Sequence, residues 1–357
     1  MKIALLSYST KPRGGVVHTL ALAEALAAAG EDVTVWTLGR GGDTGFFRPV
    51  DPAVRVRVVP FPDGPDGEDV GSRILRSIEV LGAAFTPEDY DVVHAQDCIS
   101  ANAVGDCVRT VHHLDEFTTP ELAECHERAL VNPSAHVCVS RSVADELLAG
   151  WAIKAEVIPN GVAHDRFACA AESGKRAWKE RLGRYVLAVG GIEPRKGSLD
   201  LLEAHALLRA QEPDVSLVIA GGETLFDYRE YRRRWEERAV ELGVEPIVLG
   251  PVAEDDLPPL VAAADVFAFP STKEGFGLAA MEALAAGTPV VVRDLAVLRE
   301  VFGGAARFAD GPEAFAAELG SALAWEDPDR REAGRELAAA HTWQAAAERH
   351  IAFYRSL

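Results

Sequence analysis

The sequence predicts an α/β protein of two domains, each built on a parallel, doubly wound sheet. Short runs of β-branched and aliphatic residues alternate with alanine- and leucine-rich stretches along most of the chain, which is the pattern of repeated βαβ units. A chain of 357 residues is too long for one ordinary hydrophobic core and suits two domains of usual size. An apolar content of 48% with mean hydropathy near zero is typical of a globular protein.

The expected strands recur through both halves of the chain. In order, they are Lys2–Tyr8, Asp32–Leu38, Val54–Pro60, Asp91–Ala95, Cys107–Val111, His136–Ser140, Glu156–Pro159, Tyr185–Gly190, Val215–Gly221, Pro246–Gly250, Val266–Pro270 and Pro289–Arg293. The polar stretch 163–183 has no strand pattern, so we expect it to link the domains. We expect the first domain at residues 1–165, the second at 166–340 and a terminal amphipathic helix at 341–357.

Charge and residue usage exclude several classes of function. The formal net charge is −19, from 55 acidic and 36 basic residues, which argues against nucleic acids and anionic lipid surfaces as partners. No apolar stretch is long enough to span a bilayer, and the apolar run after Met1 is too short for a signal peptide. Five cysteines without paired spacing, and ten histidines without ligand spacing, predict a cytoplasmic protein with reduced thiols and no metal site.

The segment 274–282 carries the most specific pattern in the chain. It follows the apolar run 265–270 and reads as a strand, a glycine-containing turn and a helix. Gly275 and Gly277 have no Cβ, so the backbone can approach a ligand closely, and the first N–H groups of the helix offer an anion or hydroxyl site. Glu274 and Glu282 are about two helical turns apart and can point to one side. Carboxylates beside free backbone donors suit a nucleotide sugar.

A second glycine-containing turn follows the first expected strand. Gly14 and Gly15 precede an expected helix at 19–29, so they expose N–H groups at the positive end of a helix dipole. The glycine fingerprint of NAD-binding proteins is missing, which makes an oxidoreductase a poor interpretation. His18 lies one turn further into the same region.

Histidines also follow expected strand ends in the first half. His94 ends one strand, and the neighbours His112 and His113 follow the next. In an open α/β sheet the carboxyl ends of the strands border the binding crevice. A hydrogen-bonded structural histidine at such a position remains an open alternative for each of them.

The turn after the first strand of the second half carries adjacent cations. Arg195 and Lys196 precede Gly197, and a fixed ammonium group can stabilise a departing phosphate. A solvated basic loop is the alternative.

These motifs together resemble the retaining glycosyltransferases of family four, whose GT-B fold has two facing Rossmann-like domains and a C-terminal helix that crosses back to the first. The resemblance covers nearly the whole chain. It implies catalytic roles for His112, Lys196 and Glu274. It implies donor contacts from Gly14, Gly15, Arg195, Lys196, Gly250, Glu274, Gly275, Phe276, Gly277, Leu278 and Glu282, and sugar or acceptor contacts from His18, His94 and His113.

The resemblance also implies the reaction. A hexose or N-acetylhexosamine would pass from a UDP- or GDP-linked sugar to a hydroxyl acceptor, expected to be soluble, without a metal or cofactor and with retention at the anomeric carbon. Many relatives carry an arginine where this chain has Gly191, so one of two expected cations is missing. A nucleotide-sugar epimerase, a sugar phosphorylase and a non-catalytic nucleotide-sugar binding protein stay open as alternatives, as does a homodimer.

Overall fold

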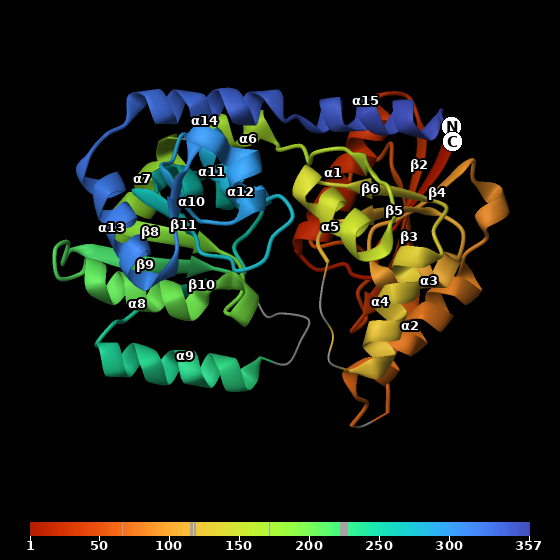
Figure 1. Ribbon diagram of the computed structural model, residues 1–357, viewed down its shortest axis with the longest axis horizontal. Coiled ribbons are helices and arrows are strands. Elements are labelled where there is room, and N and C mark those ends of the chain that lie inside the picture. Colours follow the sequence, from red (N-terminus) through yellow and green to blue (C-terminus); the bar gives the residue numbers. More distant parts are fainter. Residues whose placement is uncertain (66, 115–116, 118, 171, 222–227) are drawn as a thin grey trace. The chain divides into compact units, whose positions relative to one another are not determined.

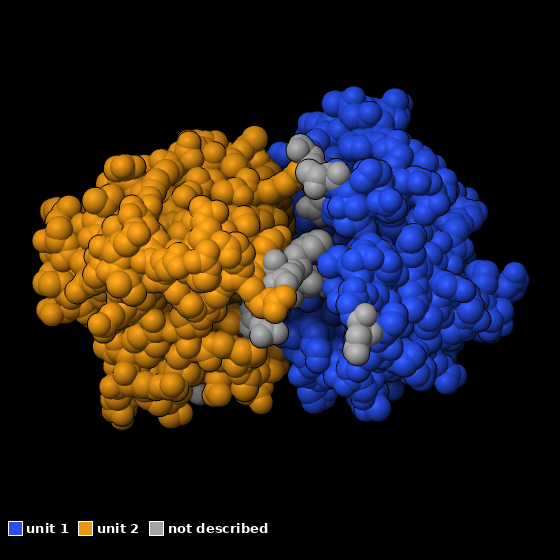
Figure 2. Space-filling model, turned by 90° about the horizontal axis from the view of Figure 1, so that it is seen from below, with its two compact units in different colours: residues 1–161, 343–357 blue, residues 162–342 orange. Residues whose placement is uncertain are grey.

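The computed structural model describes residues 1–65, 67–114, 117, 119–170, 172–221 and 228–357. The chain divides into two units, one formed by residues 1–161 with 343–357 and the other by residues 162–342 (Figure 2). Each unit is built on a parallel sheet, which confirms the predicted α/β class. The divisions lie a few residues from the boundaries expected from the sequence.

The sheet of the first unit has the order β3-β2-β1-β4-β5-β6-β7, and Figure 1 labels its strands β2 to β6. Its strands are β1 Lys2–Leu6, β2 Asp32–Arg40, β3 Arg55–Phe61, β4 Val92–Ala95, β5 Val108–Val111, β6 Ala135–Cys138 and β7 Glu156–Val157. Ile3, Leu5 and Leu6 on the central strand are fully buried. A parallel sheet covered on both faces requires such continuous apolar strands.

Helices from both ends of the chain cover this sheet. They are α1 Gly14–Ala28, α2 Val70–Ala84, α3 Cys98–Val104, α4 Pro120–Val131, α5 Arg141–Trp151 and α15 Trp343–Tyr354, with a short 3-10 turn, η1, at Pro87–Asp89. Ala347, Ile351 and Tyr354 of α15 join the apolar core that contains Leu20 of α1. The C-terminal helix is therefore a structural part of the first unit.

The sheet of the second unit has the order β10-β9-β8-β11-β12-β13. Its strands are β8 Arg184–Val189, β9 Val215–Ala220, β10 Ile247–Gly250, β11 Val266–Phe269, β12 Val290–Arg293 and β13 Arg307–Ala309. Its helices are α6 His164–Ala168, α7 Glu172–Leu182, α8 Ser198–Leu208, α9 Arg229–Leu242, α10 Leu257–Ala263, α11 Leu278–Ala285, α12 Ala296–Phe302, α13 Gly311–Ala324 and α14 Pro328–Ala340, with 3-10 turns η2 Pro194–Lys196 and η3 Gly303–Ala305.

Two sequence-based expectations about this unit are wrong. The stretch 163–183 is not a linker, because it forms α6 and α7 within the second unit. Strand β13 was not expected, because it has only three residues at the edge of the sheet and presents too short a pattern to identify.

Strand order creates a switch point in each sheet, where chain connections leave in opposite directions. These points lie between β1 and β4 and between β8 and β11. In open α/β sheets ligands bind beside the carboxyl ends of the strands at such points. The glycine turns at 14–15 and 190–197, and the turn at 274–277, all follow strands that border them.

Candidate functional site

A pocket in the second unit opens at the carboxyl ends of β8 and β11. Its lining combines the ends of these strands with the turn that precedes α8, and includes Gly190, Gly191, Lys196, Ser198, Phe269, Pro270 and Ser271. The hydroxyl of buried Ser271 has no hydrogen-bond partner among the described residues. This pocket occupies the place that the sheet topology predicts for a ligand.

Lys196 and Arg195 both contact Glu274 at this edge. Nζ of Lys196 lies 2.6 Å from Oε1 of Glu274, and Nη1 of Arg195 lies 3.1 Å from the same oxygen. Arg195 also reaches Oε1 of Glu193 at 3.3 Å. The predicted basic turn and the first predicted carboxylate are therefore one electrostatic unit, and a ligand phosphate could compete with the carboxylate for both cations.

Gly197 fixes the position of this basic turn. Its φ is +62°, and an added Cβ would lie 2.2 Å from the carbonyl oxygen of Pro270. Only glycine allows both the left-handed conformation and this close approach. The residue thus holds the end of η2 against the end of β11, where Glu274 follows.

Helix α11 begins at the same edge of the sheet, directly after the turn 274–277. Gly277, at φ +92°, precedes the helix, and an added Cβ would lie 3.1 Å from the ring of Phe302. Because the N-cap residue is glycine, no side chain caps the first turn of α11. Gly275 and Phe276 are buried, and Leu278 is partly buried. This geometry leaves the amino end of α11 suited to hydroxyl or anionic ligands.

Glu282 lies one turn further along α11 and is partly buried. Desolvation by its surroundings raises the pKa of this carboxyl to about 8, while the charge of Arg166 lowers it and that of Glu254 raises it. Arg166 pairs with Glu254 through Nη1 at 2.5 Å from Oε1. Glu282 is thus a desolvated carboxyl that forms no ion pair within the described part of the chain, a group that would gain from ligand hydroxyls.

In the first unit, the glycine turn faces a histidine. An added Cβ on Gly15 would lie 3.8 Å from Nε2 of His112, and this nitrogen has no hydrogen-bond partner among the described residues. Burial, followed by the positive charge of Arg109, holds the pKa of His112 well below its usual range. The imidazole is therefore neutral at physiological pH and is suited to hydrogen bonding rather than to proton donation.

His18 and His94 belong to the packing of the first unit. Nδ1 of His18 lies 2.9 Å from Oδ1 of Asn160, and its ring contacts that of His112 edge to face. His94 is fully buried, with Nδ1 2.6 Å from the hydroxyl of Tyr354 and Nε2 2.6 Å from that of Thr110. Both nitrogens of His94 are thus occupied by protein groups.

The remaining predicted residues are not part of the contacts described above. His113 is partly buried after β5. Gly250 ends β10 at φ +70°, and its carbonyl accepts a hydrogen bond from the N–H of Gly221 at 2.9 Å. Gly191 lines the β8–β11 pocket but supplies no charge. Arg195 is not among the residues that line this pocket, and it contacts Glu274 together with Lys196.

Several polar groups at these edges were not predicted. Gln96, next to β4, is buried, and neither amide atom has a partner among the described residues. Ser271 and the pair Arg166–Glu254 were also missed. Gln96 and Ser271 each follow a predicted strand closely, so their positions could have identified them, whereas the approach of Arg166 to Glu282 depends on the packing of α6 on α11.

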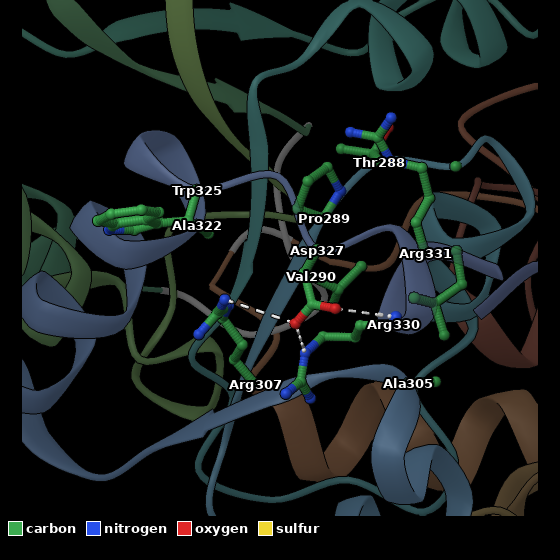
Figure 3. A pocket seen from close by; sticks show the side chains of 12 residues that line it. Thr288, Pro289, Val290, Ala305, Arg307, Ala322, Trp325, Asp327, Arg330 and Arg331 are labelled. Carbon is green, nitrogen blue, oxygen red and sulfur yellow. Dashed lines mark hydrogen bonds and ion pairs between the residues drawn. The ribbon is translucent and has the colours of Figure 1, made fainter. Parts of the chain in front are cut away.

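Another pocket of the second unit lies at the opposite, amino end of β12 (Figure 3). There Arg307 and Arg330 point toward the carboxylate of Asp327, with Nε of Arg330 3.0 Å from Oδ2. Arg330 also donates to the carbonyls of Gly304 and Ala306. These contacts join the start of α14 to η3, so we assign this pocket a structural role.

Three further properties bear on the site. Among the described residues, no three His, Cys, Asp or Glu side chains gather as metal ligands. All five cysteines are free thiols. Within the described part of the chain, no helix combines the length and apolar character needed to cross a bilayer.

Comparisons with known proteins agree with this geometry. Residues 12–166 match the family described as Glycosyltransferase Family 4, and residues 175–339 match Glycosyl transferases group 1. The D-inositol 3-phosphate glycosyltransferase of Salinispora tropica is 33% identical over 90% of this chain and 78% of that protein.

Solved structures share the fold. Anabaena HepE in complex with UDP and glucose superposes with a TM-score of 0.76 and 21% identity over 100% of both chains. Sucrose-phosphate synthase from Thermosynechococcus elongatus gives a TM-score of 0.80 and 23% identity over 99% of this chain and 98% of that one. With the sequence matches, they confirm the predicted resemblance: the chain belongs to the GT-B glycosyltransferases of family 4, the glycosyl transferases group 1.

Proposed function

We propose that this glycosyltransferase moves a hexose or N-acetylhexosamine from a nucleotide-diphosphate sugar to a hydroxyl acceptor, with retention of anomeric configuration. The observation that carries the proposal is the convergence of Lys196 and Arg195 on Glu274 at the carboxyl edge of β8 and β11. A diphosphate needs fixed positive charge as its bond to the sugar breaks. Arg195 and Lys196 can supply this positive charge, although the chain as a whole has a net charge of −19.

The donor would be held by α11 and the turn before it. In the proposal, Glu282 accepts hydrogen bonds from the ribose hydroxyls, while Glu274 and the N–H groups of Phe276, Gly277 and Leu278 bind the sugar hydroxyls. The partly desolvated carboxyl of Glu282 supports this assignment, because hydroxyl donors would stabilise its ionised form. HepE was solved with UDP, which makes UDP-linked sugars the first donors to test.

The leaving group would be stabilised by charge and backbone dipoles. Lys196 and Arg195 of the second unit would contribute cations, and the family resemblance implies that Gly14 and Gly15, at the start of α1, would contribute N–H groups. The acceptor oxygen forms the new bond to the anomeric carbon on the face from which the diphosphate leaves. The electron pair of the broken bond stays on the diphosphate, and the acceptor proton passes to a phosphate oxygen. Neutral His112 would orient the sugar.

Donor binding followed by product analysis tests this proposal. Thermal-shift measurements with UDP, GDP, ADP and their sugars identify the base, and the stabilising donor is then incubated with pools of hydroxyl acceptors, with and without EDTA. We expect an α-linked product from an α-linked donor, formed equally well with EDTA. Full turnover of donor alone, an inverted product or a strict metal requirement would each contradict the proposal. Binding without transfer to any acceptor would favour a non-catalytic binding protein.

A further inference from the structure

Arg293 is a buried cation at the carboxyl end of an otherwise aliphatic strand. It ends β12, whose other residues are valines. All four residues of the strand are buried, and Arg293 is only 7% exposed. Removing a guanidinium group from water is unfavourable unless its N–H groups find partners inside the protein. The partners of Arg293 therefore indicate what this charge does for the second unit.

The guanidinium group of Arg293 joins three elements of that unit. Its Nε donates to the carbonyl oxygen of Pro270, directly after β11, at 2.8 Å. Its Nη2 pairs with Asp200 in the first turn of α8. Its Nη1 lies 3.3 Å from Oδ1 of Asp310, which precedes α13, and its Cζ lies 5.8 Å from the centre of the Phe315 ring. The planar, fixed set of donors on a guanidinium group suits such a junction.

Two of these contacts border the turn that carries Lys196. We refer to residues 194–197 as the basic turn. An added Cβ on Gly197 would lie 2.2 Å from the carbonyl oxygen of Pro270 and 3.1 Å from Nη2 of Arg293. Asp200 follows this glycine within the first turn of α8. Arg293 thus binds both the strand end and the helix start between which the basic turn lies.

The basic turn is also joined to the segment that follows β11. The N–H of Thr272 donates to the carbonyl of Arg195 at 2.8 Å, and the hydroxyl of Thr272 donates to the same carbonyl at 3.2 Å. Nζ of Lys196 lies 2.6 Å from Oε1 of Glu274. These contacts require the basic turn and the end of β11 to keep their separation, and the guanidinium group contacts both sides of it.

We infer that Arg293 is a positioning residue of the donor site: it holds the basic turn against the end of β11 and so fixes Lys196 where it can meet the departing diphosphate. This inference rests on the proposed function, because it concerns the residue assigned to that diphosphate. Arg293 is buried and is not among the residues that line the β8–β11 pocket. Its effect on a nucleotide should therefore pass through Lys196.

A double-mutant cycle tests whether Arg293 acts through Lys196. The proteins are the wild type, Arg293→Met, Lys196→Ala and the combination of both substitutions. Isothermal titration measures the affinity for UDP and for UMP, or for the matching pair of the base found by thermal shift. The ratio of the two affinities reports on the second phosphate. Melting temperature shows that each protein is folded, and Arg293→Lys takes the place of Arg293→Met if the latter does not fold.

Arg307→Met is the matched control. Arg307 begins the neighbouring strand β13 and pairs with Glu318 at 3.2 Å, so its loss also removes an arginine from an ion pair. It lies at the amino end of the sheet, away from the β8–β11 pocket. We expect this variant to melt at a lower temperature than the wild type and to keep the wild-type preference for UDP over UMP.

We expect Arg293→Met to lose about tenfold of the preference for UDP over UMP, with the affinity for UMP unchanged. The combined variant should lose no more of this preference than Lys196→Ala alone, because the losses of two residues that act as one unit do not add. A folded Arg293 variant that keeps the preference would overturn the inference. Losses that add in the combined variant would overturn it as well, because Arg293 would then act independently of Lys196.

A crystal structure of the folded Arg293 variant separates this inference from the proposed function. We expect the basic turn to move away from Pro270, and Nζ of Lys196 to leave Oε1 of Glu274. An unmoved turn would overturn the inference. A wild type without any preference for UDP over UMP would instead refute the role of Lys196 in the proposed function, and the position of the basic turn in the variant would still decide whether Arg293 holds it.

Discussion

The ammonium group of Lys196 lies 2.6 Å from Oε1 of Glu274, although 78 positions separate the two residues in the sequence. The first follows β8 and the second follows β11, the two strands at the switch point of the second sheet. Their contact makes one charged unit of two motifs that the sequence presents separately.

Replacing Lys196 by Ala should lower kcat at least about tenfold, because the leaving diphosphate loses its point charge. Steady-state kinetics with the donor found by thermal shift measures this effect. Lys154→Ala, at an exposed position of the first unit, is the matched control and should keep wild-type kinetics. A Lys196→Ala enzyme that is as fast as the control would remove Lys196 from the chemistry.

Gly15→Ala should separate activity from stability. An added Cβ would have only ordinary contacts at 3.8 and 3.9 Å with His112, so the free energy of unfolding should change by less than about 0.5 kcal/mol. The methyl group would nevertheless stand between the backbone and the diphosphate, and kcat should fall about tenfold or more. Gly277→Ala is the contrasting variant, because its positive φ and crowded surroundings predict a lower melting temperature as well. Unchanged kinetics in Gly15→Ala would exclude the glycine turn from the site.

Glu282→Gln should change how stability depends on pH. The folded-state pKa of Glu282 is about 8, raised from 4.5 by burial, so the folded state favours the protonated carboxyl. The wild type therefore loses stability as pH rises from 4.5 through 8, and the amide variant does not. The variant should melt about 2 °C or more above the wild type at pH 8, and close to it at pH 5. At the same time its affinity for the nucleotide should fall. Parallel melting curves across this pH range would contradict the raised pKa.

His350 should contribute to loss of stability in acid. Burial lowers its pKa from 6.5 to about 4, and the groups that face it are His18, His94, Tyr354 and the charge of Arg349. The unfolded chain takes up a proton below pH 6.5, so stability falls between pH 6.5 and 4. For this residue the loss is about 2 kcal/mol at pH 5.

His350→Gln is the variant that checks this, because its amide can still donate to the carbonyl of Ala346, which Nδ1 of His350 contacts at 2.8 Å. Chemical unfolding followed at pH 7 and pH 5 should show a smaller decrease for the variant than for the wild type. An equal decrease would place the acid sensitivity on the other histidines. His94→Gln serves as the comparison at a second buried ring.

The sequence predicted the charged turn of the second unit and, in the first unit, Gly15 and His112, whereas it could not show which role His94 has. Glu274, Gly277 and Lys196 follow strands in short motifs, so local pattern and sheet topology together place them at one edge. His94 has the same local pattern, but its nitrogens are occupied by Thr110 and by Tyr354, which is 260 positions away. No local pattern could show that contact.

The surroundings of Glu282 illustrate the same limit. Arg166, whose charge acts on this carboxyl, comes from α6, and no spacing relates the two residues in the sequence. Only the packing of α6 on α11 brings them together. The stretch 163–183 was misjudged for a related reason, because its polar helix α7 is stabilised by packing on α10 and not by a strong apolar pattern of its own.

A crystal structure of the protein with UDP tests the central assignment most directly. We expect the diphosphate within hydrogen-bonding distance of Nζ of Lys196 and the ribose hydroxyls on the carboxylate of Glu282. A nucleotide bound at the amino end of β12, or anywhere that leaves both side chains without ligand contact, would contradict it.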